Sequence, residues 1–243
     1  MQIITAAVQK GGTGKTTTAA SLAQAAAYKG RKVLAIDLDP QANLTFALGA
    51  DATAPGSDLL LSGADPAELI QETAAGVDAI PASPNLAAEK SSPGSARRLQ
   101  AAIEPLKAKY DLIIIDTPPT AGELQYNALQ AATGLIIPLM ADAFCVQSLY
   151  QVTRTARQIQ GSNPDLQILG FILTQHDSRS TIARQMQDAL TARAAAVDVP
   201  FLGTIRKAVA VKEAAALQES LFKYAPNSKP AQDYLKLFDA LNL

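Results

Sequence analysis

The chain has 243 residues, of which 48% are apolar and 18% charged, and its formal net charge is −1. This length and apolar content support a sizeable core, and we expect a single domain over residues 1–243. The single cysteine excludes a disulfide framework, and the single histidine has no second histidine with which to form a zinc site. No apolar run approaches the length that spans a bilayer and no signal peptide precedes the first strand, so we expect a cytoplasmic protein with no membrane partner.

Residues 9–18 form the strongest motif of the chain. A β-branched apolar run leads into them and an Ala-rich stretch of helical spacing follows, which is the strand–loop–helix context of a phosphate-binding loop. Three glycines let the backbone turn tightly and aim N–H groups inward, and the helix adds its partial positive charge. These glycines are Gly11, Gly12 and Gly14. We expect Lys15 to reach the β- and γ-phosphates of a nucleotide and the Thr16 hydroxyl to ligate Mg²⁺.

The loop departs from the general pattern at its start. The spacing G-x-x-x-x-G-K-[ST] puts a glycine at residue 9, where the chain has Gln9 followed by Lys10. A second lysine would crowd Lys15 if both bound the same phosphates. One solution is that Lys10 points outward and meets a nucleotide held by another subunit, which implies a dimer with nucleotide at its interface.

A buried parallel strand is expected over residues 33–39, and it ends in two carboxylates, Asp37 and Asp39, before Pro40. Ligands of open α/β sheets lie at the carboxyl ends of the strands, so both side chains should emerge beside the phosphate loop. A carboxylate near the γ-phosphate can position or polarise the attacking water. The alternative is that the two carboxylates only cap a turn.

The stretch from residue 49 to 95 is rich in Ala, Gly, Pro, Ser and Asp, and we expect no chemistry in it. The pattern predicts short helices at 59–61 and 67–70, a strand at 77–82 and a loop at 91–95. A helix capped by Ser95 is expected to run to residue 109, because its apolar residues share one face.

A second strong signal follows at residues 110–119. Four apolar residues read as a central strand buried on both faces, and Asp116 lies at its carboxyl end. This is the Walker B position, where a carboxylate can hold Mg²⁺, often through water. The Thr117-Pro118-Pro119 segment predicts a stiff turn that could sense the γ-phosphate.

The remaining residues alternate between helices and strands. Expected helices cover residues 124–131, 144–159, 181–196, 211–220 and 228–243. Expected strands cover residues 134–139, 168–174 and 201–205. Because the strands are mostly continuous apolar runs, we expect an α/β fold with three layers, in which helices cover both faces of a doubly wound, mostly parallel sheet. The last helix has only two basic residues, so we expect it to pack on the sheet rather than on a membrane.

Charge is unevenly distributed along the chain. Residues 1–149 hold 10 basic and 14 acidic side chains, whereas residues 150–243 hold 11 basic and 8 acidic ones. The excess of basic residues in the second part permits an anionic partner on one face of the protein.

Three segments together resemble one known family. Residues 10–16 read K-G-G-T-G-K-T and match, residue for residue, the deviant Walker A pattern of the ParA/MinD superfamily of ATPases. Residues 37–45 resemble that superfamily's D-x-D-P-Q-x-N segment, whose Pro-Gln pair points to the DNA-segregation branch, and residues 111–119 carry the Walker B position. The chain thus resembles a ParA-type partition ATPase of the short form, without an N-terminal DNA-binding domain.

The resemblance implies a P-loop ATPase with ATP and Mg²⁺ as cofactors. The catalytic residues it implies are Lys10, Lys15 and Asp39. The nucleotide-binding residues it implies are Lys10, Gly11, Gly12, Thr13, Gly14, Lys15, Thr16, Thr17, Asp39, Asp116 and Arg206. Thr16 and Asp116 would hold Mg²⁺, Asp116 through water if not directly.

Two further segments resemble parts of the family that lie near the nucleotide. Residues 175–179 resemble the loop that lies near the adenine in the family, with a surface loop that binds no ligand as the alternative. Asp142 begins a segment near which family members contact nucleotide or the partner subunit.

Relatives often read I-P-x-x-V-R-x-x-E-A where this chain has residues 205–214, with Arg206 in place of the proline and Ala210 in place of the arginine. The family uses this neighbourhood for adenine and for DNA, so the missing arginine puts the DNA contact in doubt, and Lys207 or Lys212 is the expected substitute.

The function that the resemblance implies is DNA segregation. An ATP-bound homodimer would bind DNA without reading its sequence and associate with the nucleoid, and a ParB-like protein bound to a centromere-like site would stimulate slow hydrolysis that resets the dimer. A second reading keeps the ATP switch but positions a protein cargo instead of DNA. A third, an ATP-driven reductase component, would need cysteines for an iron–sulfur cluster, and one cysteine per chain is too few.

Overall fold

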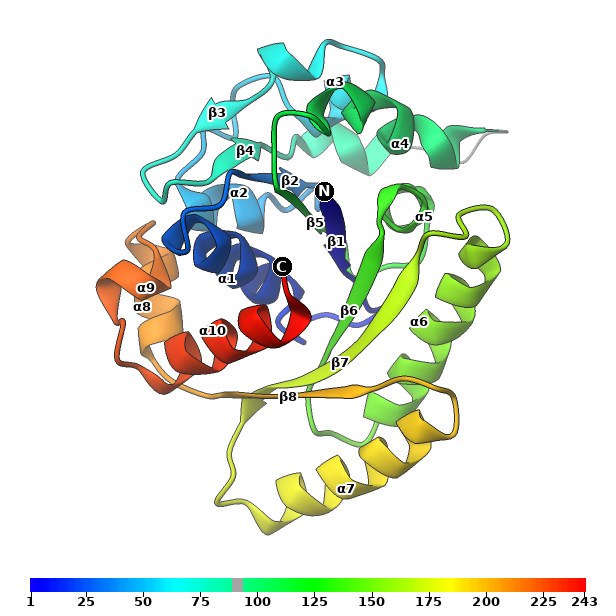
Figure 1. Cartoon of the computed structure of the whole chain (residues 1–243), viewed down its shortest axis with the longest axis vertical. Helices are drawn as coiled ribbons and strands as arrows, with labels where there is room; N and C mark the ends of the chain where they lie inside the picture. The colour runs from blue at the N-terminus through cyan, green and yellow to red at the C-terminus, as the bar shows by residue number, and fades with distance from the viewer. Residues whose placement is uncertain (89–93) are drawn as a thin grey trace.

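The computed structural model of the chain describes residues 1–88 and 94–243, so the first part of the loop expected at 91–95 lies outside the described residues. Within these ranges one sheet has the strand order β3-β4-β2-β5-β1-β6-β7-β8 (Figure 1). The strands are β1 Gln2–Ala6, β2 Val33–Asp37, β3 Gln71–Glu72, β4 Asp78–Ile80, β5 Leu112–Asp116, β6 Gly134–Leu139, β7 Gln167–His176 and β8 Phe201–Arg206. All neighbours pair in parallel except β3 and β4, which pair antiparallel. The expected doubly wound, mostly parallel sheet is confirmed.

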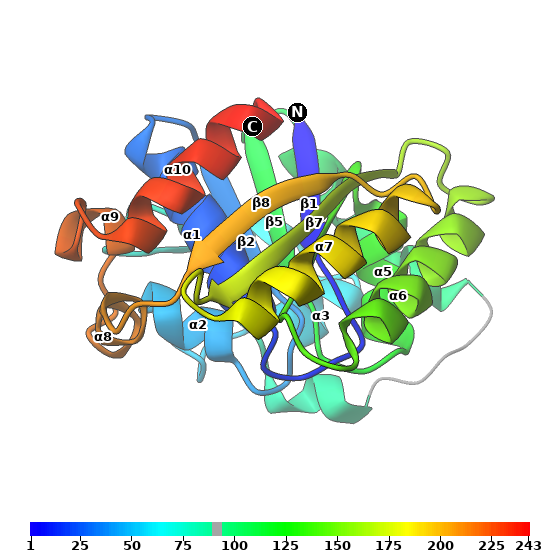
Figure 2. The ribbon, with the colours of Figure 1, turned by 90° about the horizontal axis from the view of Figure 1, so that it is seen from below.

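Helices cover both faces of this sheet, which gives three layers (Figure 2). One face carries α1 Lys15–Tyr28, α2 Asn43–Leu48, α8 Ala210–Ala216, α9 Leu221–Tyr224 and α10 Lys229–Leu241. The other face carries α3 Ser57–Leu61, α4 Arg98–Ile103, α5 Glu123–Ala131, α6 Cys145–Gln160 and α7 Thr181–Ala195. Short 3₁₀ turns lie at Pro66–Glu68, Pro84–Ala88, Ser95–Arg97 and Glu104–Leu106.

The two faces have separate apolar cores because side chains alternate along each strand. In β1, Ile3 packs with the layer of α5 and α6, whereas its neighbour Ile4 packs with the layer of α1 and α10. In β5, Ile113 and Ile114 divide in the same way. Both faces are therefore buried, which is why these strands read as continuous apolar runs.

The order of the strands brings three functional segments to one edge of the sheet. β1 lies between β5 and β6, and β2 is the next neighbour of β5. Ala6 at the end of β1 pairs with Asp116 of β5, which in turn pairs with Asp37 of β2. The phosphate loop and both expected carboxylate segments therefore leave the sheet side by side, as open α/β sheets require of a binding site.

Two helices differ from expectation. The helix expected from 95 to 109 is broken into a 3₁₀ turn, α4 and a second 3₁₀ turn, because Pro105 cannot donate the next helical hydrogen bond. The helix expected over 211–220 ends early, where Gln218 adopts a left-handed conformation with φ 55°. Ser220 then caps α9 by accepting from the Phe222 N–H at 3.3 Å.

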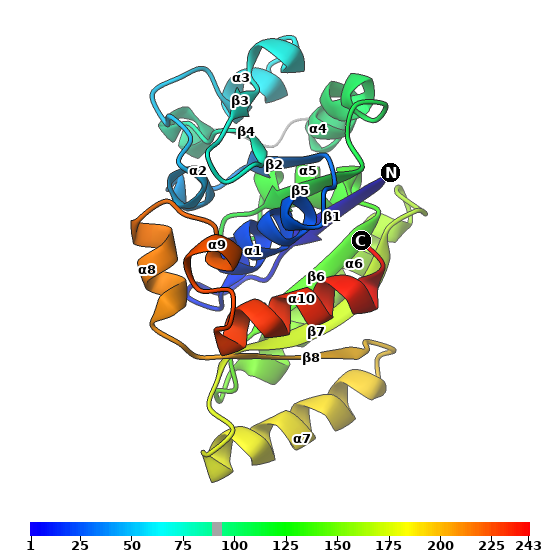
Figure 3. The ribbon, with the colours of Figure 1, turned by 60° about the vertical axis from the view of Figure 1, so that its left-hand side comes forward.

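Several elements were not expected, among them α2 directly after the Asp39 segment, the short antiparallel strand β3 and the short helix α9. Figure 3 shows α2 and α8 flanking one end of α1. Within residues 1–88 and 94–243, no helix combines the length and the apolar character that crossing a membrane requires.

Candidate nucleotide-binding site

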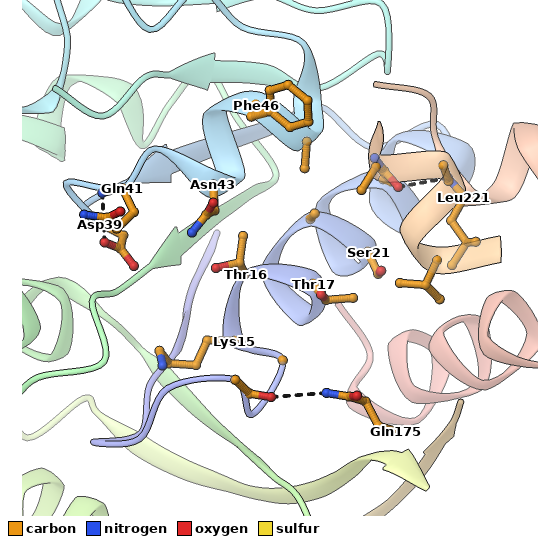
Figure 4. A pocket seen from close by; sticks show the side chains of 18 of the residues that line it. Lys15, Thr16, Thr17, Ser21, Asp39, Gln41, Asn43, Phe46, Gln175 and Leu221 are labelled. Carbon is orange, nitrogen blue, oxygen red and sulfur yellow. Dashed lines mark hydrogen bonds between the residues drawn. The ribbon is translucent and has the colours of Figure 1, made fainter. Parts of the chain in front are cut away.

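The phosphate loop joins β1 to α1 through left-handed glycines. Gly12 has φ 74°, and Gly14, the residue before α1, has φ 86°. Only glycine adopts these angles without strain. A Cβ at Gly14 would also lie 3.3 Å from Cγ2 of Thr174, so the loop is pressed against the end of β7. The first N–H groups of α1 consequently open onto the cavity shown in Figure 4.

Lys15, the first residue of α1, is buried and turns back over its own loop. Its Nζ donates to the carbonyl oxygen of Lys10 at 2.8 Å. Burial lowers the pKa of this ammonium, while the carboxylates of Asp116 and Asp39 oppose that shift. A buried cation whose hydrogen bond goes to a neutral carbonyl is well suited to receive an anionic oxygen.

Asp116 is fully buried at the end of β5, and neither of its carboxylate oxygens has a hydrogen-bond partner among the described residues. Burial raises its pKa well above the ordinary value, the Asp37 charge adds to this, and the nearby Thr16 hydroxyl and Lys15 ammonium oppose it. Orphaned buried oxygens beside a hydroxyl fit Mg²⁺, which prefers oxygen ligands. In the described ranges no three His, Cys, Asp or Glu side chains are grouped to hold a metal alone, so phosphate or water oxygens would complete the site.

Asp37 and Asp39 have different surroundings. Asp37 accepts from the backbone N–H and the hydroxyl of Thr45, both at 2.8 Å, and from the Asp39 N–H at 3.0 Å. Burial raises its pKa to about 6, against these hydrogen bonds. Both carboxylates cap the turn that follows β2, because Asp37 accepts from the Asp39 N–H and Asp39 accepts from the Gln41 N–H.

Asp39 is aimed into the cavity. Its Oδ1 accepts from the Gln41 N–H at 3.0 Å, and its side chain lines the same hollow as Lys15 and Thr16 (Figure 4). A carboxylate in this position can orient a water molecule at the end of a bound triphosphate.

Lys10 does not line the cavity of its own loop. Its Nζ forms an ion pair with Asp142, in the segment between β6 and α6, and lies 5.4 Å from the centre of the Phe144 ring. Asp142 is fixed in turn, because its Oδ1 accepts from the Phe144 N–H at 2.9 Å. The Lys10 side chain remains 27% exposed, so the ammonium is held at the surface rather than in the cavity.

Two residues at the end of β7 hold the phosphate loop through hydrogen bonds to its carbonyl groups. Thr174 Oγ1 donates to the Thr13 carbonyl at 2.6 Å, and Gln175 Nε2 donates to the Gly12 carbonyl at 3.1 Å. Both belong to the end of β7, and no spacing rule connects them to the loop. Gln175 belongs to the loop expected near the adenine, whereas Asp177 and Arg179 of that loop form an exposed ion pair at 3.0 Å.

Two hollows adjoin at the loop. The larger, about 490 Å³, follows the phosphate loop and α1 towards α2 and α8. The second, about 400 Å³, is lined by residues 205–209, 211 and 212, with Gly14, Thr17, Thr174, Gln175 and Tyr234. Lys207 and Lys212 thus face a hollow beside the phosphate loop.

Arg206 lines this second hollow, but its guanidinium is bound elsewhere. Its Nη2 and Nε donate to the Asp233 carboxylate at 2.6 and 2.9 Å. The charge of Arg206 is therefore paired with Asp233, and its part in nucleotide binding stays a prediction.

Comparison with known proteins shows which family the chain is similar to. The family model described as an AAA domain matches residues 1–168. The sporulation initiation inhibitor protein Soj of Bacillus subtilis is 36% identical over 97% of this chain and 96% of its own. The chromosome partitioning protein ParA of Caulobacter vibrioides is 36% identical over 98% of this chain and 92% of its own.

A solved structure from Mycobacterium smegmatis, named cobyrinic acid a,c-diamide synthase with bound ATP analogue and magnesium, has a TM-score of 0.86 and 33% identity, covering 100% of this chain and 94% of that one. Its name gives an activity other than partitioning, but its fold holds a nucleotide and magnesium.

Proposed function

The chain belongs to the ParA/Soj family of partitioning ATPases, and we propose that residues 1–243 act as one ATPase domain whose ATP-bound homodimer binds DNA without reading its sequence. ATP and Mg²⁺ are its cofactors, and ATP-driven DNA segregation is its function. The observation that carries the proposal is the placement of Lys10, which does not line the cavity and is paired with Asp142, whereas Lys15 and Asp39 line the cavity. Asp116 lies buried close enough to Lys15 to act on its pKa.

Within one subunit, the loop residues Gly11 to Thr17 would bind the phosphates of ATP. Lys15 would leave the Lys10 carbonyl and pair with the β- and γ-phosphates, since an anionic oxygen is a stronger partner for an ammonium than a neutral carbonyl. The N-terminus of α1 adds the field of its unpaired N–H groups.

Thr16 and Asp116 would hold Mg²⁺, directly or through water. The ion, when bound, neutralises charge that develops on the phosphates during transfer. Its positive charge also resolves the electrostatic cost of an ionised Asp116, because the carboxylate then has a cation beside it.

Asp39 would orient the attacking water. The hydrogen bond from the Gln41 N–H fixes one of its carboxylate oxygens, and the Asp39 N–H is itself fixed by Asp37. We therefore assign water positioning to Asp39 and support of Asp39 to Asp37.

Lys10 would reach the phosphates of ATP in a second subunit. In the single chain it rests on Asp142, at the surface and close to the exposed Phe144 ring. A partner's triphosphate carries more negative charge than one carboxylate, so it would attract Lys10 away from Asp142 and close the dimer around two nucleotides.

DNA binding would use the basic second part of the chain. Dimerisation brings together two copies of residues 150–243, in which 11 basic side chains exceed 8 acidic ones. Lys207 and Lys212 line the hollow beside the phosphate loop, which favours Arg184 and Arg193 of α7 as DNA contacts over these two lysines. A ParB-like partner bound to a centromere-like site would accelerate hydrolysis and release the dimer.

The test is binding to random-sequence duplex DNA with ATP, with ADP and without nucleotide, for the wild type and Lys10→Ala. The proposal predicts binding that requires ATP, weakens steeply with salt and disappears in Lys10→Ala. Lys10→Ala should still bind ADP, because Lys10 does not line its own phosphate cavity.

ATP-dependent dimerisation without DNA binding would contradict the DNA part of the proposal and favour positioning of a protein cargo. DNA binding that is equal with ATP, ADP and no nucleotide would contradict the switch itself.

A further inference from the structure

We propose that Thr174 and Gln175 are positioning residues that aim backbone N–H groups of the phosphate loop at the β-phosphate of the nucleotide. This inference rests on the proposed ATP site and adds to it two side chains from the end of β7, more than 150 residues from the loop in sequence: the hydrogen bonds span 161 and 163 residues.

The backbone at the end of β7 is irregular where Gln175 contacts the phosphate loop. The pairing of β7 with β8 shifts its register between Leu173 and His176. Gln175, within this irregularity, has φ 51°, a left-handed conformation that costs free energy in any residue except glycine. The distortion places the Gln175 side chain at the junction of the two hollows, against the phosphate loop (Figure 4). Bulges of this kind re-aim side chains at binding sites.

The two hydrogen bonds fix two consecutive peptide planes. Gln175 holds the Gly12 carbonyl at 3.1 Å, and Thr174 holds the Thr13 carbonyl at 2.6 Å. In a trans peptide the C=O and the following N–H point in opposite directions. Holding these two carbonyls against β7 therefore turns the N–H groups of Thr13 and Gly14 away from β7, towards the interior of the loop where a phosphate would lie.

The attachment is rigid because Thr174 is buried and tied to the sheet. Its hydroxyl also lies 3.2 Å from the Leu139 carbonyl at the end of β6, and its Cγ2 lies close to Gly14. Gln175 is additionally 3.6 Å from the sulfur of Met140, just after β6. The loop thus rests on two neighbouring strand ends, so its N–H groups are directed before the nucleotide arrives.

The chemistry of these contacts predicts what they affect. Both donors are neutral and act through the backbone, so they favour any ligand with a β-phosphate and do not distinguish ADP from ATP. This separates them from Lys10, which is expected to matter only for ATP and only in the dimer.

The first experiment compares Thr174→Val with Thr174→Ser by the affinity for ADP with Mg²⁺. Valine keeps the shape of threonine and removes the hydroxyl, whereas serine keeps the hydroxyl. We expect Thr174→Val to bind ADP about three- to tenfold more weakly, the usual effect of one hydrogen bond, and Thr174→Ser to bind within about twofold of the wild type.

The second experiment uses Gln175→Gly, which removes the amide but relieves the left-handed backbone. We expect the thermal unfolding midpoint without nucleotide to be unchanged or raised, while the affinity for ADP falls about three- to tenfold. A merely structural role would move the two quantities in the same direction.

A third readout observes the N–H groups themselves. Nuclear magnetic resonance should show that the amide signals of Thr13 and Gly14 shift on ADP binding in the wild type and that their positions without ligand differ in Thr174→Val. If the wild type binds ADP but both Thr174→Val and Gln175→Gly bind it equally well, the positioning role is wrong. If the wild type fails to bind ADP, the proposed ATP site itself is wrong.

Discussion

The ends of β2 and β5 offer two buried carboxylates in paired positions with opposite surroundings. Asp37 and Asp116 face each other in the register of the two strands. Asp37 accepts three hydrogen bonds, two from Thr45 and one from the Asp39 N–H. Among the described residues, neither oxygen of the buried Asp116 carboxylate has a hydrogen-bond partner. One carboxylate completes the fold, and the other is left for a ligand.

The residues that follow each carboxylate explain the difference. After Asp37 the chain turns back, so the N–H groups of Asp39 and Thr45 reach the carboxylate. After Asp116 come Thr117, Pro118 and Pro119, and prolines have no N–H to donate. The Thr117 hydroxyl donates instead to the Ala6 carbonyl at 3.0 Å. A carboxylate that its own chain cannot satisfy is therefore kept beside the phosphate loop.

The largest expected effect is that of Asp116→Asn. Hydrolysis of ATP should fall about a hundredfold or more, because the Mg²⁺ site loses its charge. Stability without nucleotide should rise by about 1–2 kcal/mol, because burial raises the pKa of the Asp116 carboxyl well above its ordinary value and so costs free energy at pH 7, whereas an amide does not ionise. Phosphate release and urea unfolding measure the two effects. A fall in both would show that Asp116 has a structural role.

Removing Asp37 should do the opposite to stability. Asp37→Ala leaves three buried donors without their acceptor, so the free energy of unfolding should fall by about 2–4 kcal/mol. Thr45→Val removes the hydroxyl that donates to Asp37 and accepts from the buried Ala82 N–H at 2.9 Å, and this smaller change should cost about 1–2 kcal/mol. Equal losses in the two variants would mean that Asp37 is not the centre of this network.

The pH dependence of stability should reveal both carboxylates. The pKa of Asp37 is raised to about 6 and that of Asp116 is raised as well, so the folded protein keeps protons that the unfolded chain releases near pH 4. Stability without ligand should therefore increase as the pH falls from 7 to 5, by about 1 kcal/mol or more. Urea unfolding at pH 7, 6 and 5 measures this, and Asp116→Asn should reduce the slope. A decrease in stability over this range would contradict the account.

The smallest expected effect concerns the ion pair between Lys10 and Asp142. Asp142→Asn should change stability by less than about 1 kcal/mol, because the ion pair is partly exposed. It should nevertheless lower the protein concentration needed for ATP-dependent dimerisation by about two- to fivefold, since Lys10 no longer has to leave a carboxylate. Light scattering with ATP measures the dimer. Weaker dimerisation would mean that Asp142 contributes to the dimer interface instead of competing with it for Lys10.

Local motifs account for what the sequence could predict. The glycines and Lys15, the Asp39 segment and Asp116 all lie next to a strand that their own neighbours define, so spacing alone placed them at one edge of the sheet. Their roles in ATP hydrolysis stay predictions until variants are measured.

The rest of the site depends on contacts between segments distant in sequence. Thr174 reaches Thr13 across 161 residues and Lys10 reaches Asp142 across 132, and both contacts exist only because β6 and β7 follow β1 in the sheet. The Arg206–Asp233 pair is a similar case, in which a residue chosen from a family pattern is held by α10 instead. A single sequence carries no spacing rule for such pairs.

The measurement that tests the central claim most directly mixes two inactive variants, Lys10→Ala and Asp39→Ala. If Lys10 acts on the nucleotide of the partner subunit, a mixed dimer has one complete site: Asp39 of the first variant with Lys10 of the second. The equimolar mixture should then hydrolyse ATP at about a quarter of the wild-type rate, because half of the dimers are mixed and each has one working site. A mixture no more active than the two variants measured separately would show that Lys10 does not act across the dimer.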